Sequence, residues 1–282
     1  MIPDFAADAE RLAAIALAED GPCDVTSDVT VASGARGAGQ LEFRSGGVLA
    51  GRVYADAVAR ACGCTIAWAV PEGAQLDRRA VIGTAAGRLA SLLQAERPLL
   101  NLLQRASGIA TATRAYVGAV AETPARILHT RKTAPGLRPL DIAGVLAGGG
   151  TLHRLDLAHT VMVKDNHWQA LAAQGKTLHA ALADARARGI RGLQVEVESE
   201  TQLRSACEAG ATRLLVDNQS PGTVQRWATL ARELAPGIEI EATGGITLEN
   251  VRAYAEAGAD FISVGALTHS VKAADIAFEI TA

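Results

Sequence analysis

Short apolar runs alternate with helical stretches through the second half of the chain. The runs are typical of buried strands and lie at residues 126–129, 161–163, 193–195, 214–216, 238–240 and 261–264. Stretches with an apolar face at helical spacing follow most of them, at residues 178–188, 201–209, 223–234 and 247–257. This alternation favours a parallel sheet with right-handed crossovers, and we expect the sheet to curve into an α/β barrel of the TIM type.

The first part of the chain has a mixed pattern. An amphipathic helix is expected near residues 6–18, and strand-like runs lie at residues 40–43 and 65–68. Pro98 is expected early in a helix that runs to residue 106, and Gly108 is expected to interrupt that helix. These features predict an α+β unit up to residue 107, with a domain boundary there.

Charged residues and glycines follow the predicted strands. Barrel enzymes place their chemistry in the loops at the C-terminal ends of the strands. At those positions the chain carries Thr130 with Arg131 and Lys132, Lys164 with Asp165, Glu196 with Glu198, Asp217 with Asn218, Thr243 with Gly244 and Gly245, and Gly265 with Ala266. Six such placements predict an active site at this end of the barrel.

Cations form one group among the candidate site residues. Arg131, Lys132 and Lys164 follow predicted strands, and His153 with Arg154 lies between the first two of these strands. Arginine binds carboxylate or phosphate through two parallel hydrogen bonds, and lysine supplies a point charge. The mixed set therefore suits a substrate that carries both groups, although solvated surface charge is the alternative for any single residue.

Carboxylates and glycines form the other group. Glu196 and Asp217 end successive strands, which suits Mg²⁺ held by oxygen ligands or the hydroxyls of a sugar. Gly244 and Gly245 precede a helix expected to begin near Thr247, and backbone amides at a helix N-terminus bind phosphate. A turn that only leads into the helix is the alternative for the two glycines.

Two other chemistries fit the residues less well. Lys132 or Lys164 could form a Schiff base, as a buried lysine does in barrel aldolases. The six histidines form neither HxH nor HExxH spacing, and none neighbours a cysteine, which disfavours a transition-metal site.

Composition disfavours several classes of protein. Lys and Arg total 27 against 30 Asp and Glu, so there is no basic excess for binding nucleic acid. The N-terminus is acidic and amphipathic, and no apolar run approaches the roughly 18 residues of a membrane span, so we expect a cytoplasmic protein that does not bind membranes. The four cysteines lack paired spacing and are expected to be buried, reduced thiols.

Ordered motifs along essentially the whole chain carry a family resemblance. They include Ala95-Glu96-Arg97, Thr130-Arg131-Lys132-Thr133, Gly148-Gly149-Gly150, His153-Arg154, Lys164-Asp165-Asn166-His167, Asp217-Asn218 and Gly244-Gly245-Ile246-Thr247. In these motifs the chain resembles the quinolinate phosphoribosyltransferases, the decarboxylating nicotinate-nucleotide pyrophosphorylases that make nicotinate mononucleotide. The resemblance implies a transferase of NAD biosynthesis.

The resemblance also implies the architecture. An N-terminal α/β sandwich over residues 1–107 is expected to join an incomplete, seven-stranded α/β barrel over residues 108–269. Residues 270–282 are expected to pack back on the first domain. The family forms homodimers or higher assemblies with shared active sites, so Arg105 is expected to reach the site of the neighbouring subunit.

Roles for individual residues follow from the same resemblance. The two carboxylates of quinolinate are expected to bind Arg105, Thr130, Arg131, Lys132, His153 and Arg154. Phosphoribosyl pyrophosphate is expected to bind Lys164, Glu196, Asp217, Thr243, Gly244, Gly245, Gly265, Ala266 and His269. The expected catalytic residues are Lys132, Lys164, Glu196 and Asp217, with Glu196 and Asp217 as ligands of Mg²⁺. The implied reaction needs no covalent enzyme intermediate, which argues against a Schiff base.

Some positions depart from the family pattern. His129 stands where the family often has aspartate, and the segment 140–147 lacks the basic residues common there. That segment is more similar to the molybdenum-operon relative, a pyrophosphorylase of the same fold. A transferase with another anionic acceptor is therefore the alternative, and a non-catalytic anion-binding homologue is a further one.

Overall fold

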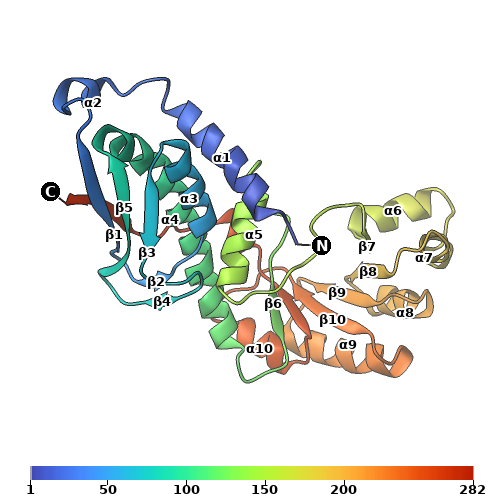
Figure 1. The fold of residues 1–282 in the computed structure, drawn as a ribbon. Coiled ribbons are helices and arrows are strands. Elements are labelled where there is room, and N and C mark those ends of the chain that lie inside the picture. Colours follow the sequence, from blue (N-terminus) through green and yellow to red (C-terminus); the bar gives the residue numbers. More distant parts are fainter. Residues whose placement is uncertain (1, 282) are drawn as a thin grey trace. The chain divides into compact units, whose positions relative to one another are not determined.

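The computed structural model describes residues 2–281 and divides into two compact units (Figure 1). Unit 1 comprises the chain up to residue 114, residues 133–150 and the chain from residue 266 on, and unit 2 comprises residues 115–132 and 151–265. These units differ from the predicted domain ranges, because residues 108–114, 133–150 and 266–269 pack with unit 1.

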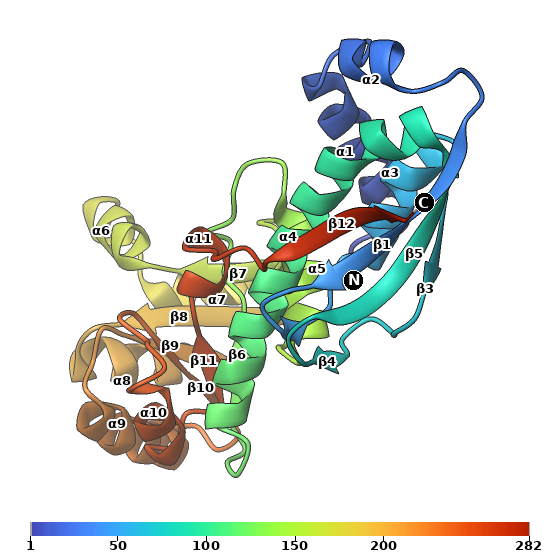
Figure 2. The same ribbon diagram turned by 90° about the vertical axis from the view of Figure 1, so that its left-hand side faces the viewer.

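A four-stranded antiparallel sheet lies at the centre of unit 1. Its order is β12 (Ile276–Thr281), β1 (Arg36–Phe43), β5 (Ala80–Arg88) and β3 (Thr65–Trp68). A short pair, β2 (Gly47–Val48) and β4 (Gln75–Leu76), lies apart from it. Strand β12 pairs with β1 from Ala38 to Phe43, and Figure 2 shows β12 in red beside β1.

Unit 1 also contains helices, and several of them share one core with the sheet. The helices are α1 (Phe5–Glu19), α2 (Val25–Thr30), α3 (Arg52–Ala61), most of α4 (Leu89–Ala119), α5 (Arg138–Ala147) and α11 (Ala266–His269). Leu12 of α1, Tyr54 of α3, Leu103 of α4 and Leu140 of α5 lie in one buried core with Phe43 of β1. Because Leu140 belongs to this core, the segment after Thr133 packs with unit 1 although barrel strands flank it in sequence.

Helix α4 differs from its prediction at both ends. Pro98 lies within the helix, nine residues after its start at Leu89, and the helix continues through Gly108 to Ala119. Gly108 is needed there for a close approach, since a Cβ at this position would lie 2.2 Å from the carbonyl oxygen of Lys272. The predicted break at Gly108 is therefore wrong, because packing and not a turn explains this glycine.

Unit 2 contains six parallel strands, and all six predicted runs are confirmed as strands. They are β6 (Arg126–Leu128), β7 (Thr160–Val163), β8 (Gly192–Val197), β9 (Arg213–Asp217), β10 (Glu239–Thr243) and β11 (Phe261–Ser263), in the order β6-β11-β10-β9-β8-β7. Beyond β6, Thr151 adds a single parallel bridge to Leu128. The seventh position of the expected barrel is thus reduced to one bridge, and the barrel is incomplete.

Helices follow the strands of unit 2, as the alternation predicts. They are α6 (Asp165–Ala173), α7 (Leu178–Ala187), α8 (Glu200–Glu208), α9 (Pro221–Leu234) and α10 (Val251–Glu256). The last of these begins at Val251 and not near Thr247. Asn250 explains the later start, because its side chain accepts a hydrogen bond from the Thr247 amide (2.8 Å) and donates one to the Gly245 carbonyl (2.9 Å), which holds the preceding residues in a turn.

No helix within residues 2–281 is both long and apolar enough to cross a membrane. The four cysteines are free thiols. Their predicted burial is confirmed for Cys64 and Cys207 and wrong for Cys23, which is exposed, while Cys62 is half-buried. Burial raises the pKa of the Cys64 and Cys207 thiols, so both favour the unreactive protonated form.

Candidate active site

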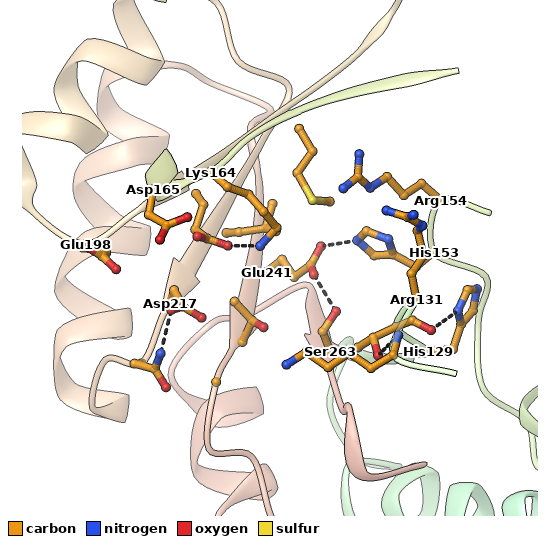
Figure 3. A pocket seen from close by; sticks show the side chains of 18 residues that line it. His129, Arg131, His153, Arg154, Lys164, Asp165, Glu198, Asp217, Glu241 and Ser263 are labelled. Atoms are coloured by element: carbon orange, nitrogen blue, oxygen red, sulfur yellow. Dashed lines mark hydrogen bonds and ion pairs between the residues drawn. The ribbon is translucent and has the colours of Figure 1, made fainter. Parts of the chain in front are cut away.

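A cavity of about 470 Å³ opens at the carboxyl ends of the parallel strands of unit 2 (Figure 3). Its volume lies in the usual range for small-molecule sites. The cavity is lined by His129, Thr130, Arg131, Lys132, His153, Arg154, Met162, Lys164, Asp165, Glu196, Glu198, Leu215, Asp217, Asn218, Glu241, Thr243, Gly244 and Ser263. The structure therefore brings together most of the residues that the strand ends predict as a site.

Cations gather on one side of the cavity. Figure 3 shows Arg131, His153 and Arg154 together, and Lys132 lines the same cavity. The Nε of Arg131 is buried with no hydrogen-bond partner among the described residues. Burial, and then the charge of Arg131, lower the pKa of Arg154. Two partly buried guanidinium groups that repel each other are arranged to receive an anion.

Carboxylates gather on the other side, at the ends of β8 and β9. Glu196 is buried and forms an ion pair with Lys164, and Asp217 accepts a hydrogen bond of 2.6 Å from the side-chain amide of Asn218. Desolvation, and then the charge of Glu196, raise the pKa of Asp217. Both carboxylates line the cavity, and two like charges near each other favour a hydroxyl donor or a cation between them.

The acidic side fits a magnesium ion that is shared with a substrate. Mg²⁺ is commonly held by one or two carboxylates, with substrate phosphates and water completing the shell, and Glu196 and Asp217 supply such a pair. Within residues 2–281 there is no cluster of three or more His, Cys, Asp or Glu side chains that could hold a metal ion by itself. The donors therefore fit an ion that a substrate helps to bind.

The turn after β10 is built from two glycines. Gly244 and Gly245 have φ angles of +83° and +62°, which favour glycine. The amide of Asn218, itself at φ +51°, donates to the Thr243 carbonyl (2.9 Å) and fixes the turn beside the end of β9. Because α10 begins only at Val251, a phosphate here would bind the amides of the turn and not a helix N-terminus.

Gly244→Ala is expected to destabilise the protein by about 2–3 kcal/mol and to impair the turn. An added Cβ would lie 2.2 Å from the Asn218 side-chain oxygen, in addition to the strain of positive φ. Gly245→Ala is the matched control, because its Cβ would meet nothing within 4 Å, and it should cost about 1 kcal/mol. Urea denaturation of both variants measures the difference, and equal losses would contradict this account of the turn.

Five predicted site residues do not line the cavity. Gly245 and Gly265 belong to unit 2, whereas Arg105, Ala266 and His269 belong to unit 1. Arg105 forms a bidentate ion pair with Asp141, from Nε to Oδ1 (2.7 Å) and from Nη2 to Oδ2 (2.9 Å), and Nη1 takes no part in this pair. The carboxylate of Asp141 is fully buried, so Arg105 has a structural partner within its own unit.

The strand-end pattern missed three polar residues that line the cavity: His129, Glu241 and Ser263. Glu241 lies in the middle of β10 and is 1% exposed, and Ser263 ends β11 beside it. His129 is fully buried, and its Nδ1 lies 3.2 Å from the Thr130 carbonyl oxygen. One signal was available for Glu241, since an acidic residue at an inward position of an apolar strand is costly unless it is paired.

Fold and site together define an α/β-barrel protein with a two-sided cavity for polyanionic small molecules. The family model described as quinolinate phosphoribosyl transferase, C-terminal domain, matches residues 109–279, and that of the N-terminal domain matches residues 24–107. The chain belongs to the quinolinate phosphoribosyltransferase family.

Individual relatives agree with this assignment. The nicotinate-nucleotide pyrophosphorylase [carboxylating] of Mycobacterium leprae is 40% identical over 91% of both chains. The human protein of the same name is 39% identical over 86% of this chain and 82% of its own. Among solved structures, the nicotinate-nucleotide pyrophosphorylase of Francisella tularensis superposes with a TM-score of 0.91 at 29% identity, covering 100% of this chain and 98% of that one.

Proposed function

We propose that the protein transfers the phosphoribosyl group of phosphoribosyl pyrophosphate to quinolinate. The products are nicotinate mononucleotide, pyrophosphate and CO₂, as in the reaction of the family. The observation that carries the proposal is the two-sided cavity, where Arg131, His153 and Arg154 lie on one side and Asp217 on the other (Figure 3), with Glu196 also in the lining. A dicarboxylate acceptor suits the first side and a ribose with a charged leaving group suits the second.

The cationic side is proposed to bind the acceptor. Two carboxylates on adjacent ring carbons need several hydrogen-bond donors at fixed positions. Arg131, Arg154 and His153 supply planar donor groups, and Lys132 adds a point charge. Thr130 supports this side, since its hydroxyl accepts a hydrogen bond of 3.2 Å from the Lys132 amide. Holding both carboxylates directs the ring nitrogen toward the sugar carbon, which lowers the entropic cost of the reaction.

The acidic side is proposed to bind the phosphoribosyl donor. Glu196 and Asp217 would accept hydrogen bonds from ribose hydroxyls and stabilise the positive charge that develops on the sugar as pyrophosphate departs. Lys164 pairs with Glu196 and also lines the cavity, where its ammonium group would balance the charge of the leaving phosphates. Backbone amides at Thr243, Gly244, Gly245, Gly265 and Ala266, with the His269 side chain, are proposed to hold the 5′-phosphate.

Mg²⁺ is proposed to bind between Glu196, Asp217 and the donor, where it would neutralise charge on pyrophosphate. After transfer, the ring nitrogen is a pyridinium cation, and its charge stabilises the electron pair that loss of the 2-carboxylate as CO₂ leaves on C2. A proton from water then adds to C2 and gives nicotinate mononucleotide. No covalent bond to the enzyme is needed. The ion pair between Lys164 and Glu196 is consistent with this, because a salt-bridged ammonium is a poor nucleophile.

The proposal extends to a cytoplasmic homodimer with shared sites. Its support is the family resemblance, in which the equivalent of Arg105 serves the cavity of the neighbouring subunit. Within one chain the bidentate pair with Asp141 fixes the direction of the Arg105 side chain and uses only Nε and Nη2. Nη1 would then be the group presented to the other subunit.

Turnover with different acceptors tests the proposed function. The purified protein is incubated with phosphoribosyl pyrophosphate, Mg²⁺ and either quinolinate or nicotinate, and nucleotide products are separated by chromatography. We expect nicotinate mononucleotide from quinolinate and none from nicotinate, because nicotinate carries only one of the two carboxylates that the cationic side is proposed to bind. Reaction with a different anionic acceptor alone would support the molybdenum-operon type of activity, and donor binding without turnover would support a non-catalytic homologue.

A further inference from the structure

Glu241 is a buried carboxylate in the wall of the cavity, and the proposed reaction gives it no role. Figure 3 shows its hydrogen bonds to His153 at Nε2 (3.2 Å) and to the hydroxyl of Ser263 (2.5 Å). It also accepts a hydrogen bond from Nη1 of Arg213 (3.1 Å). Only 1% of Glu241 is exposed, so these partners replace water almost completely. Burial acts to raise its pKa, yet the hydrogen bonds and charges of His153, Ser263 and Arg213 hold that pKa below its ordinary value.

The charges around Glu241 do not balance without the histidine. Arg213 also pairs with Glu239 (2.8 Å), and its guanidinium lies 3.9 Å from the centre of the Phe261 ring. One arginine is therefore shared between two carboxylates, Glu239 with 46% of its side chain exposed and Glu241 in a site that excludes water. The side chain of His153 is 7% exposed and lies against the charge of Glu241, so an imidazolium ring at this position completes the balance.

The other neighbours of His153 are cations or a second imidazole. Arg131 and Arg154 line the same side of the cavity, and the ring of His129 lies edge-on to that of His153 with 6.4 Å between centres. Without a buried anion, these like charges would repel one another before a substrate arrives. Glu241 also attracts Arg154, since its charge raises the pKa of that guanidinium against the larger effects of burial and Arg131.

We propose that Glu241, supported by Ser263 and Arg213, is a positioning residue that holds His153 as an imidazolium with Nε2 turned inward and Nδ1 available to an acceptor carboxylate. This inference rests on the proposed function for the identity of the acceptor. It assigns the specificity for a dicarboxylate partly to a residue that does not touch the substrate. Binding of the phosphoribosyl donor at the acidic side should depend little on Glu241.

Glu241→Gln separates the charge of this residue from its shape. The amide oxygen can accept from His153 and Arg213 while the amide nitrogen donates to Ser263, so the hydrogen bonds persist and the negative charge is lost. Glu239→Gln is the matched control, because it removes a carboxylate from the same arginine, but Glu239 is 46% exposed and does not bind His153. We expect Glu241→Gln to raise KM for quinolinate about tenfold, which corresponds to the loss of one charge-assisted hydrogen bond.

In the same variant, KM for phosphoribosyl pyrophosphate and kcat should change less than about threefold, and Glu239→Gln should change all three constants less than about threefold. Unchanged or tighter quinolinate binding in Glu241→Gln would overturn the proposal. If Glu241 only made the cavity less positive, loss of its charge would strengthen the binding of an anion such as quinolinate.

A measurement without substrates keeps this inference separate from the proposed function. The ¹⁵N chemical shifts of the His153 ring, assigned from the signal missing in His153→Asn, distinguish imidazolium from neutral imidazole. At pH 7 we expect imidazolium in the wild-type protein and in Glu239→Gln, and a neutral ring in Glu241→Gln. A neutral ring in the wild-type protein would overturn the inference even if the variant does not fold. An imidazolium ring in a protein that does not bind quinolinate would instead overturn only the proposed function.

Discussion

Replacing Arg131 with glutamine is expected to lower kcat/KM for quinolinate about a hundredfold or more. The Arg131 guanidinium lines the cavity, and its buried Nε has no hydrogen-bond partner among the described residues. A carboxylate would supply that partner together with a second, parallel hydrogen bond, and two hydrogen bonds to charged groups are worth about 3–6 kcal/mol when both are lost. Steady-state kinetics with quinolinate varied at saturating phosphoribosyl pyrophosphate measures this loss.

The Arg131 variant should remain folded. The charge of Arg131 contributes to lowering the pKa of Arg154, so its removal relieves repulsion within the cavity. Arg188→Gln provides the control, because Arg188 is 70% exposed in unit 2 and only pairs with Asp184 one helical turn away. The account of the acceptor side fails if Arg131→Gln keeps kcat/KM within threefold of the wild type.

Asp217→Asn is expected to lower kcat about a hundredfold or more while making the protein more stable at neutral pH. Desolvation and the charge of Glu196 raise the pKa of Asp217, so ionisation of this carboxylate has a cost: it lowers the free energy of unfolding at neutral pH. Asparagine has nearly the same shape and no charge. The variant therefore removes the cost and also removes the negative charge proposed to stabilise the developing cation on the sugar.

The pH dependence of this gain follows from the direction of the pKa shift. Because the folded-state pKa of Asp217 lies above the ordinary value of an aspartate, its protonated form favours folding at acid pH, and that stability is lost as the pH rises through the folded-state pKa. The variant should match the wild type near pH 3 and melt about 1–3 °C higher at pH 7. Glu200→Gln, which alters an exposed pair with Arg204, should show no such gain. A variant that is active, or less stable at pH 7, would contradict this role for Asp217.

The strand-end part of the site could be predicted because parallel strands bring their carboxyl ends to one edge. Arg131, Lys164, Glu196 and Asp217 follow separate strands in sequence, and all four line one cavity. This clustering needs only the direction of the strands and their order in the sheet. The roles of these residues toward quinolinate and phosphoribosyl pyrophosphate remain predictions that the variants above test.

Other features depend on side-chain and backbone contacts that the sequence pattern does not reveal. An acidic residue at an inward strand position marks Glu241 as unusual, but its partners Arg213, Ser263 and His153 come from three other parts of the chain and could not be predicted. Gly108 suggested a helix break, but the residue is glycine because the backbone of Lys272 packs against it. Lys272 lies far along the sequence, so this contact could not be predicted. The start of α10 at Val251 depends on side-chain hydrogen bonds of Asn250, which propensity alone does not reveal.

The fate of the quinolinate 2-carboxylate tests the central claim most directly. Quinolinate labelled with ¹⁴C at the 2-carboxylate, and a second sample labelled at the 3-carboxylate, are each incubated with the protein, phosphoribosyl pyrophosphate and Mg²⁺. We predict one labelled CO₂ for each pyrophosphate released from the first sample, and label retained in nicotinate mononucleotide from the second. Pyrophosphate release without labelled CO₂ from the first sample, or no reaction with either, would contradict the assignment of this cavity as a decarboxylating phosphoribosyltransferase site.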